Sequence, residues 1–303
     1  MAASALTPSR SVSARPGAGK IWNAPAPLRI WHLASLDAPT VAVAWSLAFA
    51  WTAQIHLPLW VPVLLALGTW AVYIIDRLLD ARAGLRAGSF HFLRERHFFH
   101  WRHRRILLAV AVCAASAAAA IIVAFMPASV RQHNSAFAVA ALAYFSSVHA
   151  LHQSPNHRRT LFSRALHIKE FVVGVLFTAG CALPTLSRLH GIAGPATKQW
   201  PLIAAISFFA ALAWLNCRAI EHWESNPAPS RIPIAAIALG SVASLLANVL
   251  IHAQPRTAAL LAAGSVSAFL IAALDYFRPR LTPIALRAAA DLVLLTPLFL
   301  LAR

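Results

Sequence analysis

Residues 106–126 read ILLAVAVCAASAAAAIIVAFM, a run without a single charged side chain. At a rise of about 1.5 Å per residue, a helix of about 20 such residues crosses the hydrocarbon core of a bilayer. Backbone groups in lipid must be hydrogen-bonded within the chain, and no stretch of this sequence alternates as a barrel strand does. The run therefore predicts a transmembrane helix and an all-α membrane protein.

The rest of the chain repeats this pattern. Of its 303 residues, 59% are hydrophobic and 12% are charged, whereas soluble domains carry about 25% charged residues. The mean hydropathy is +0.66. These values exclude an ordinary soluble domain. We predict nine transmembrane helices, of which the fourth, fifth and ninth are interrupted by polar residues: 38–55, 57–76, 106–126, 135–152, 168–186, 200–219, 232–253, 257–275 and 283–302.

The positive charge is distributed unevenly between the two sides that these spans define. With a cytoplasmic N-terminus, the outer segments hold only five of the 26 Lys and Arg residues, and cytoplasmic segments hold the others. Such asymmetry is the positive-inside pattern of membrane proteins. It explains the net charge of +17 without nucleic acid as a partner. We expect an integral protein of a bacterial inner (plasma) membrane. The five outer residues are Arg131, Arg188, Lys198, Arg256 and Arg303.

The N-terminal segment differs in composition from the spans. Residues 1–30 are rich in Ala, Ser, Pro and Arg, and the first acidic residue of the chain is Asp37. This composition predicts a disordered, basic cytoplasmic tail, with an organellar transit peptide as the alternative. The membrane domain is then residues 31–303.

Two groups of acids close spans two and six. In YIIDRLLD, Asp76 and Asp80 are one helical turn apart, with Tyr73 and Arg77 beside them. Paired carboxylates of this kind suit Mg²⁺, which takes one or two carboxylates together with substrate phosphates. The alternative is a solvated helix end whose acids are balanced by neighbouring arginines.

The second group is NCRAIEHWE, at the end of span six. Glu221 and Glu224 share one helix face, and Asn216 lies deeper in the same helix. Acidic ends four helices apart predict an internal pseudo-repeat with a site between the two halves.

The chain resembles the UbiA superfamily of intramembrane prenyltransferases over about residues 30–303. Asp76, Arg77 and Asp80 match the end of its first Asp-rich motif, and Asn216 and Glu224 match the outer positions of its second. The resemblance implies a nine-helix bundle of two pseudo-repeats. It also implies a prenyl diphosphate held through Mg²⁺ and transfer of its prenyl group to a lipophilic or aromatic acceptor.

In the hypothesis of a transferase, each candidate residue has a role, and a local ion pair is the alternative for Lys169. Asp76 and Asp80 hold one Mg²⁺ and, with Lys169, are the catalytic residues, while Glu224 holds a second Mg²⁺. Basic residues stabilise the departing diphosphate. The substrate-binding set is Tyr73, Arg77, Arg86, Arg94, Asn216 and Glu221.

Some residues depart from the family pattern. Val72 and Tyr73 stand where the family has Asn and Asp, and Ile220 replaces a central acid of the second motif. They motivate a second hypothesis, a non-catalytic relative that binds a lipid or quinone. A transporter is a third hypothesis, disfavoured because the acids lie at one membrane face rather than at the midplane.

Other polar residues allow more than one interpretation. The loop 82–105 is basic and aromatic, as in a helix lying on the membrane surface. His97, His100 and His103 recur every third residue within it, a conceivable metal site among many cations. Arg287 and Asp291 form an i,i+4 pair inside span nine, which we interpret as a structural contact between helices.

Overall fold

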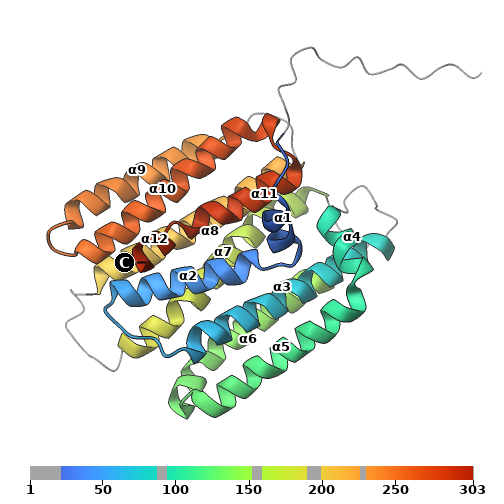
Figure 1. Cartoon of the computed structure of the whole chain (residues 1–303), viewed down its shortest axis with the longest axis horizontal. Helices are drawn as coiled ribbons and strands as arrows, with labels where there is room; N and C mark the ends of the chain where they lie inside the picture. The colour runs from blue at the N-terminus through green and yellow to red at the C-terminus, as the bar shows by residue number, and fades with distance from the viewer. Residues whose placement is uncertain (1–21, 87–93, 152–158, 190–198, 226–229, 303) are drawn as a thin grey trace, which may run out of the picture.

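The computed structural model describes residues 22–86, 94–151, 159–189, 199–225 and 230–302. These residues form helices, their connections and one isolated β-bridge. The predicted all-α class is confirmed. The helices are α1 (Ala26–Leu33), α2 (Asp37–Thr52), α3 (Trp60–Arg86), α4 (Glu95–Arg102), α5 (Arg104–Phe125), α6 (Ala128–Leu151), α7 (Arg159–Leu189), α8 (Trp200–Ser225), α9 (Ile232–Leu250), α10 (Pro255–Phe277), η3 (Arg278–Arg280), α11 (Pro283–Leu292), η4 (Val293–Leu295) and α12 (Leu298–Leu301) (Figure 1).

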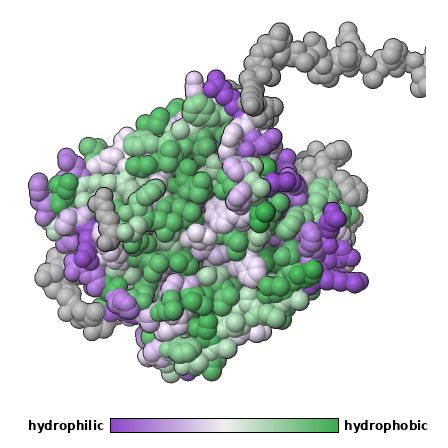
Figure 2. Space-filling view, viewed as in Figure 1, coloured by the Kyte–Doolittle hydropathy of each residue, from purple (hydrophilic) through white to green (hydrophobic). Residues whose placement is uncertain are grey.

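Long apolar helices make this chain an integral membrane protein. Seven segments within the described residues are long and apolar enough to cross a membrane: α3, α5, the part of α7 from Lys169, α8, α9, α10 with η3, and the α11–α12 segment. An eighth crossing results if α1 and α2, which meet at 87°, are one broken span. Hydrophobic residues cover the middle of the visible face and hydrophilic residues gather towards the helix ends (Figure 2).

Several helices differ from the predicted spans. The predicted span 135–152 corresponds to α6, which is not among the seven, and span 283–302 is broken into α11, η4 and α12. Helix α3 runs ten residues beyond the predicted end at Asp76, to Arg86. Residues 77–86 are mostly Leu, Ala and Arg, which favour helix, so nothing ends it earlier. Asp76 and Asp80 therefore lie inside a helix rather than at its end.

The core is built around α2. This helix contacts α3, α7, α8, α10 and the α11–α12 segment. The indole ring of Trp45 stacks on Phe209 of α8, with ring centroids 3.9 Å apart, and its Nε1–H donates to the carbonyl of Leu294 at 2.8 Å. All of these groups are buried. One side chain therefore joins α2, α8 and η4.

Helix α8 also packs closely on α7. A Cβ atom built on Gly174 would lie 2.9 Å from the backbone nitrogen of Trp214, so only glycine fits at this crossing. Small residues allow such close approach between membrane helices. The polar ends of α3, α4, α8 and α11 meet at one end of the resulting bundle (Figure 1).

Candidate functional site

A sharp turn between α1 and α2 carries three buried polar side chains. Helix α1 ends at Leu33, and Ser35 has a left-handed backbone with φ 59°. Non-glycine residues adopt this conformation uncommonly. The turn directs His32, Ser35 and Asp37 inward, and each is at most 1% exposed. Buried polar groups need partners, so this turn marks a polar site inside the bundle.

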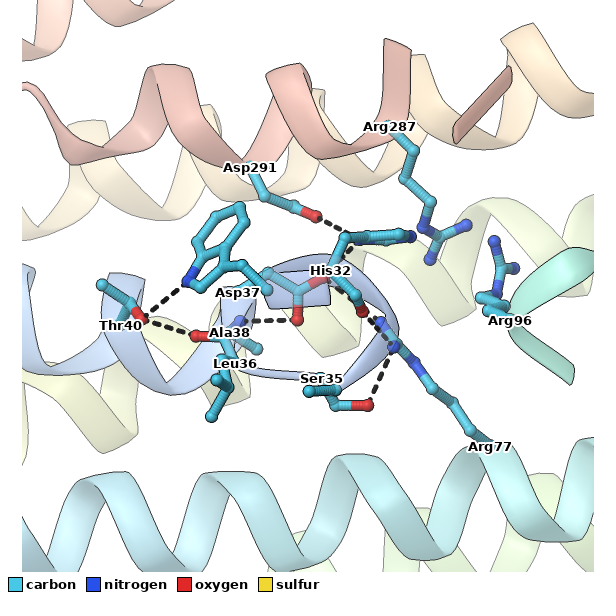
Figure 3. A network of polar contacts seen from close by, with 12 residues as sticks. His32, Ser35, Leu36, Asp37, Ala38, Thr40, Arg77, Arg96, Arg287 and Asp291 are labelled. Atoms are coloured by element: carbon cyan, nitrogen blue, oxygen red, sulfur yellow. Dashed lines mark hydrogen bonds and ion pairs between the residues drawn. The ribbon is translucent and has the colours of Figure 1, made fainter. Parts of the chain in front are cut away.

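His32 and Asp37 form a close pair. The Nδ1 atom of His32 lies 2.7 Å from Oδ2 of Asp37, whose Oδ1 accepts from the backbone N–H of Ala38 at 2.9 Å (Figure 3). A second carboxylate oxygen, Oδ2 of Asp291 in α11, lies 3.8 Å from the same nitrogen. A carboxylate only accepts, so Nδ1 carries the proton and Nε2 is the basic nitrogen.

Arg77 of α3 binds the turn from the other side. Its guanidinium donates to the carbonyl of His32 at 3.0 Å, to Oγ of Ser35 at 2.8 Å and to Oδ2 of Asp37 at 3.3 Å. Arg77 is only 4% exposed. Three hydrogen bonds satisfy most of its donors, and the nearby carboxylate compensates its buried charge. The residue predicted to bind substrate is thus held by the α1–α2 turn.

Helix α4 covers the site with two buried histidines. The Nδ1 atom of His100 contacts the carbonyl of Arg96 at 2.7 Å, and its Nε2 contacts Oγ of Ser35 at 3.1 Å. Burial lowers the pKa of His100 to about 4. Burial and the nearby Arg96 charge lower the pKa of His97 to about 3. Both are therefore neutral at pH 7, and the Nδ1 atom of each forms a hydrogen bond with a backbone group.

Glu224, near the end of α8, lies between two arginines. Arg96 donates to its Oε1 at 2.9 Å and Arg287 of α11 at 2.8 Å. Burial lowers the pKa of Arg96, to about 10, so this guanidinium stays charged at pH 7. Arg94 donates to the Glu224 carbonyl at 2.6 Å. Through Glu224, the side chains of Arg96 and Arg287 link α4, α8 and α11.

A cavity of about 670 Å³ opens beside these residues. Four arginines and two glutamates line it, so positive charge is in excess. A smaller cavity of about 130 Å³ shares Glu224 and Arg287. The residues lining the large cavity are Asn23, Ala24, Arg29, His32, Arg94, Glu95, Arg96, Glu224, Thr282, Pro283, Ile284 and Arg287.

Two buried polar atoms beside the cluster have no partner among the described residues. One is Nε of Arg287, a donor, and the other is Oδ1 of Asn216, an acceptor. The amide of Asn216 donates to Oδ1 of Asp291 at 3.3 Å. Unsatisfied buried groups are few in native structures, and a bound molecule is one explanation for them.

Within the described residues, the one group of three possible metal ligands is His32, Asp37 and Asp291, with ligand atoms within 4.8 Å of one another. The surrounding cluster already balances the carboxylates of Asp37, Asp291 and Glu224 with the guanidinium groups of Arg77, Arg96 and Arg287. A divalent cation would add two uncompensated charges to a buried site, which is costly. The donor set therefore does not fit a resident metal.

The residues expected from the two acidic motifs are dispersed. Asp76 and Asp80 lie half-buried on α3 and do not line the large cavity. Glu221 is half-buried on α8, and Arg86 ends α3, its side chain outside the described part of the chain. Tyr73 is half-buried on α3, within electrostatic range of Asp37, Asp291 and Arg77. Hydrogen bonds hold four of the predicted residues at the cavity or in its cluster, the last of them through the α1–α2 turn: Glu224, Arg94, Asn216 and Arg77.

Lys169 lies apart from this cluster. Its side chain is exposed on α7, and its carbonyl accepts from the hydroxyl of Tyr144 at 3.1 Å. Glu170, next to it, is buried and pairs with Arg218 at 3.4 Å. Helical geometry points neighbouring side chains in different directions, and this separates the exposed lysine from its buried neighbour.

No family model matches the chain, and no curated protein or solved structure matches it either. The site is therefore defined by its own geometry. Sequence reasoning missed His32 and Asp37 as site residues, and it treated Arg287 and Asp291 as partners of each other. Instead Arg287 pairs with Glu224, and Asp291 faces His32 and Asn216. The available signal was the charged pair inside an otherwise apolar span.

Proposed function

We propose that this protein holds the diphosphate of a prenyl diphosphate in the arginine-lined cavity and transfers the prenyl group to a lipophilic or aromatic acceptor. We also propose that the chain crosses the membrane nine times, with α6 and the α1–α2 pair among the crossings. The observation that carries the proposal is the convergence of four arginines on one cavity at the polar end of a membrane bundle.

The chemistry of the cavity supports an anionic ligand. Guanidinium groups bind phosphate oxygens through paired N–H donors and keep their charge at every physiological pH. Arg29, Arg94, Arg96 and Arg287 exceed the two lining glutamates in charge, and the Nε–H of Arg287 has no partner among the described residues. An entering phosphate group would offset this excess of positive charge.

The surroundings support an amphiphilic ligand. Pro283 and Ile284 line the same cavity, and α8 and α11 lead from it along segments apolar enough to cross a membrane. A ligand with a charged end and an apolar chain matches such a place. During transfer, the bond between the allylic carbon and the diphosphate oxygen breaks, and fixed guanidinium groups stabilise the charge of the departing diphosphate.

Glu224 does not fit the metal role expected for it, because two arginines already hold its carboxylate. Binding of Mg²⁺ by Asp76 and Asp80 stays a prediction, and the proposed function depends on the arginines alone.

A second candidate is a non-catalytic protein that binds a lipid or quinone. The pairing of the Glu224 carboxylate with two arginines favours it, as does Tyr73 in place of the first aspartate of the family motif. This candidate shares the cavity but forms no product.

The test compares ligand binding with turnover. Purified protein in detergent is heated with prenyl diphosphates of increasing length, with and without Mg²⁺. A ligand that binds only the folded state stabilises it by about 2.7 kcal/mol at a hundredfold excess over its Kd. Arg29→Ala removes an exposed cavity arginine and should weaken this effect several-fold, whereas Arg82→Ala, at an exposed position outside the cavity, should not.

Release of diphosphate and formation of a prenylated acceptor are then followed with the ligands that bind. Product formation supports the transferase. Binding without product across a panel of phenolic, quinone and lipid acceptors supports the second candidate, and no stabilisation by any prenyl diphosphate contradicts the proposed function.

A further inference from the structure

His32 stands between the arginine-lined cavity and two buried carboxylates. Its ring lines the cavity, while its Nδ1 atom lies 2.7 Å from Asp37 and 3.8 Å from Asp291. Figure 3 shows both aspartates at one edge of the ring and Arg287 and Arg96 beyond the opposite edge. The imidazole thus connects a negative interior with a positive cavity.

We infer that His32 is a proton-binding residue of this cavity, which takes up a proton at Nε2 when a phosphate-type anion enters and donates that N–H to the anion. The inference rests on the proposed function in one respect, that the cavity binds anions. It adds a hydrogen-bond donor to the arginines and makes anion affinity dependent on pH.

The tautomer of the neutral His32 ring leaves Nε2 without a proton to donate to an anion. Because Asp37 accepts from Nδ1–H, the Nε2 atom of the neutral ring carries a lone pair. No hydrogen bond of Nε2 is found among the described residues. A lone pair repels an anion, whereas a protonated Nε2 donates a charge-assisted hydrogen bond to it. Binding of an anion therefore favours the imidazolium form.

The charges around the ring allow this change. Asp37 faces it from α2, Asp291 and Arg287 from α11, and Arg77 from α3. Arg96 of α4 lies beyond the same edge as Arg287 and shares Glu224 of α8 with it. The three guanidinium groups offset the carboxylates around the ring, so the imidazole stays neutral while the cavity is empty.

An entering dianion changes that balance. It adds two negative charges beside the ring, and a proton on His32 offsets one of them. The imidazolium would then be flanked by Asp37 and Asp291 on one side and by the anion on the other. Arg287, which lines the cavity, would contact the same anion.

Inorganic sulfate is a suitable probe, because its charge does not change between pH 6 and 8. The Kd of sulfate for the full-length protein in detergent is measured by calorimetry at pH 6, 7 and 8. We expect affinity to rise as pH falls, by up to about tenfold per pH unit for one coupled proton. His32→Gln should bind sulfate with an affinity that is nearly independent of pH.

His103→Gln is the matched control, since His103 lies on the same side of the molecule but does not line the cavity. It should keep the pH dependence of the wild type. A Kd for sulfate that is constant with pH in the wild type overturns the inference. So does the same pH dependence in His32→Gln.

A second measurement covers the case that His32→Gln does not fold. The binding heat of sulfate to the wild type at pH 7 is compared in buffers of different ionisation enthalpy, which counts the protons taken up. A net uptake approaching one proton is expected, and zero uptake overturns the inference. If neither sulfate nor diphosphate binds at any pH, the proposed function itself fails, an outcome distinct from binding without proton uptake.

Discussion

The acidic ends of α3 and α8 look equivalent in the sequence, and the structure makes them different. Near the end of α8, Glu224 points to the charged cluster and binds Arg96 and Arg287. On α3, the residue that enters the cluster is Arg77, while Asp76 and Asp80 are half-buried on a helix that continues to Arg86 and do not line the large cavity.

This difference shows that motif spacing does not identify the working side chain. Successive helical residues are about 100° apart, so Asp76 and Arg77 cannot both face the same partner. The cluster uses the arginine of α3 and the glutamate of α8, which makes the two helices complementary in charge rather than duplicates.

The largest expected effect comes from removing the arginine of α3. Arg77→Ala leaves Asp37 buried without its guanidinium partner, and breaking a buried pair costs about 3–5 kcal/mol. The melting temperature in detergent should fall by roughly 10 °C. Arg82→Ala, on an exposed face of the same helix, should change stability by less than about 0.5 kcal/mol. Equal losses of stability in the two variants would contradict the buried pairing of Arg77 with Asp37.

The next effect concerns the glutamate of α8. Glu224→Gln leaves Arg96 and Arg287 without a shared carboxylate, which should destabilise the protein by about 2–4 kcal/mol. Sulfate should bind this variant more tightly than the wild type, because it can replace the missing charge. Glu221→Gln, one helical turn away, serves as the control and should change neither the stability nor the sulfate affinity. A Glu224→Gln protein with unchanged sulfate affinity would argue against an anion site beside these arginines.

Acid should weaken the contact between α4 and the bundle. The pKa of His97 is lowered to about 3 and that of His100 to about 4, so the unfolded chain binds protons that the folded protein does not. Their contribution to stability is complete above pH 6.5 and is lost as pH falls from about 6.5 to 4 for His100 and to about 3 for His97, on the order of 2–3 kcal/mol for one histidine. His100→Gln should reduce this loss in melting experiments across pH, and His103→Gln should leave it intact.

The smallest effect is expected for the aspartate at the far end of the α3 motif. Asp80→Asn should change stability by less than about 1 kcal/mol and leave sulfate and diphosphate affinity unchanged, because Asp80 is half-exposed and does not line the large cavity. Loss of diphosphate binding in this variant would show that the acidic motifs of α3 and α8 both take part in binding. It would also support the Mg²⁺ site predicted from the sequence.

The sequence by itself determined the environment and the class of fold. Runs such as residues 106–126 can satisfy their backbone only as helices in lipid, and this requirement is local. Helix ends were less predictable, because residues 77–86 favour helix as strongly as the apolar residues before them.

The tertiary structure decided which side chains meet. His32 and Asp37 flank a turn in which Ser35 has a left-handed backbone, and the sequence does not predict this conformation. Their partners Arg77 and Asp291 come from helices far along the chain. Pairing of buried charges depends on the rotation and crossing of whole helices, which packing such as Trp45 on Phe209 sets. Local composition places charges at one end of the bundle, and only packing determines which of them face the cavity.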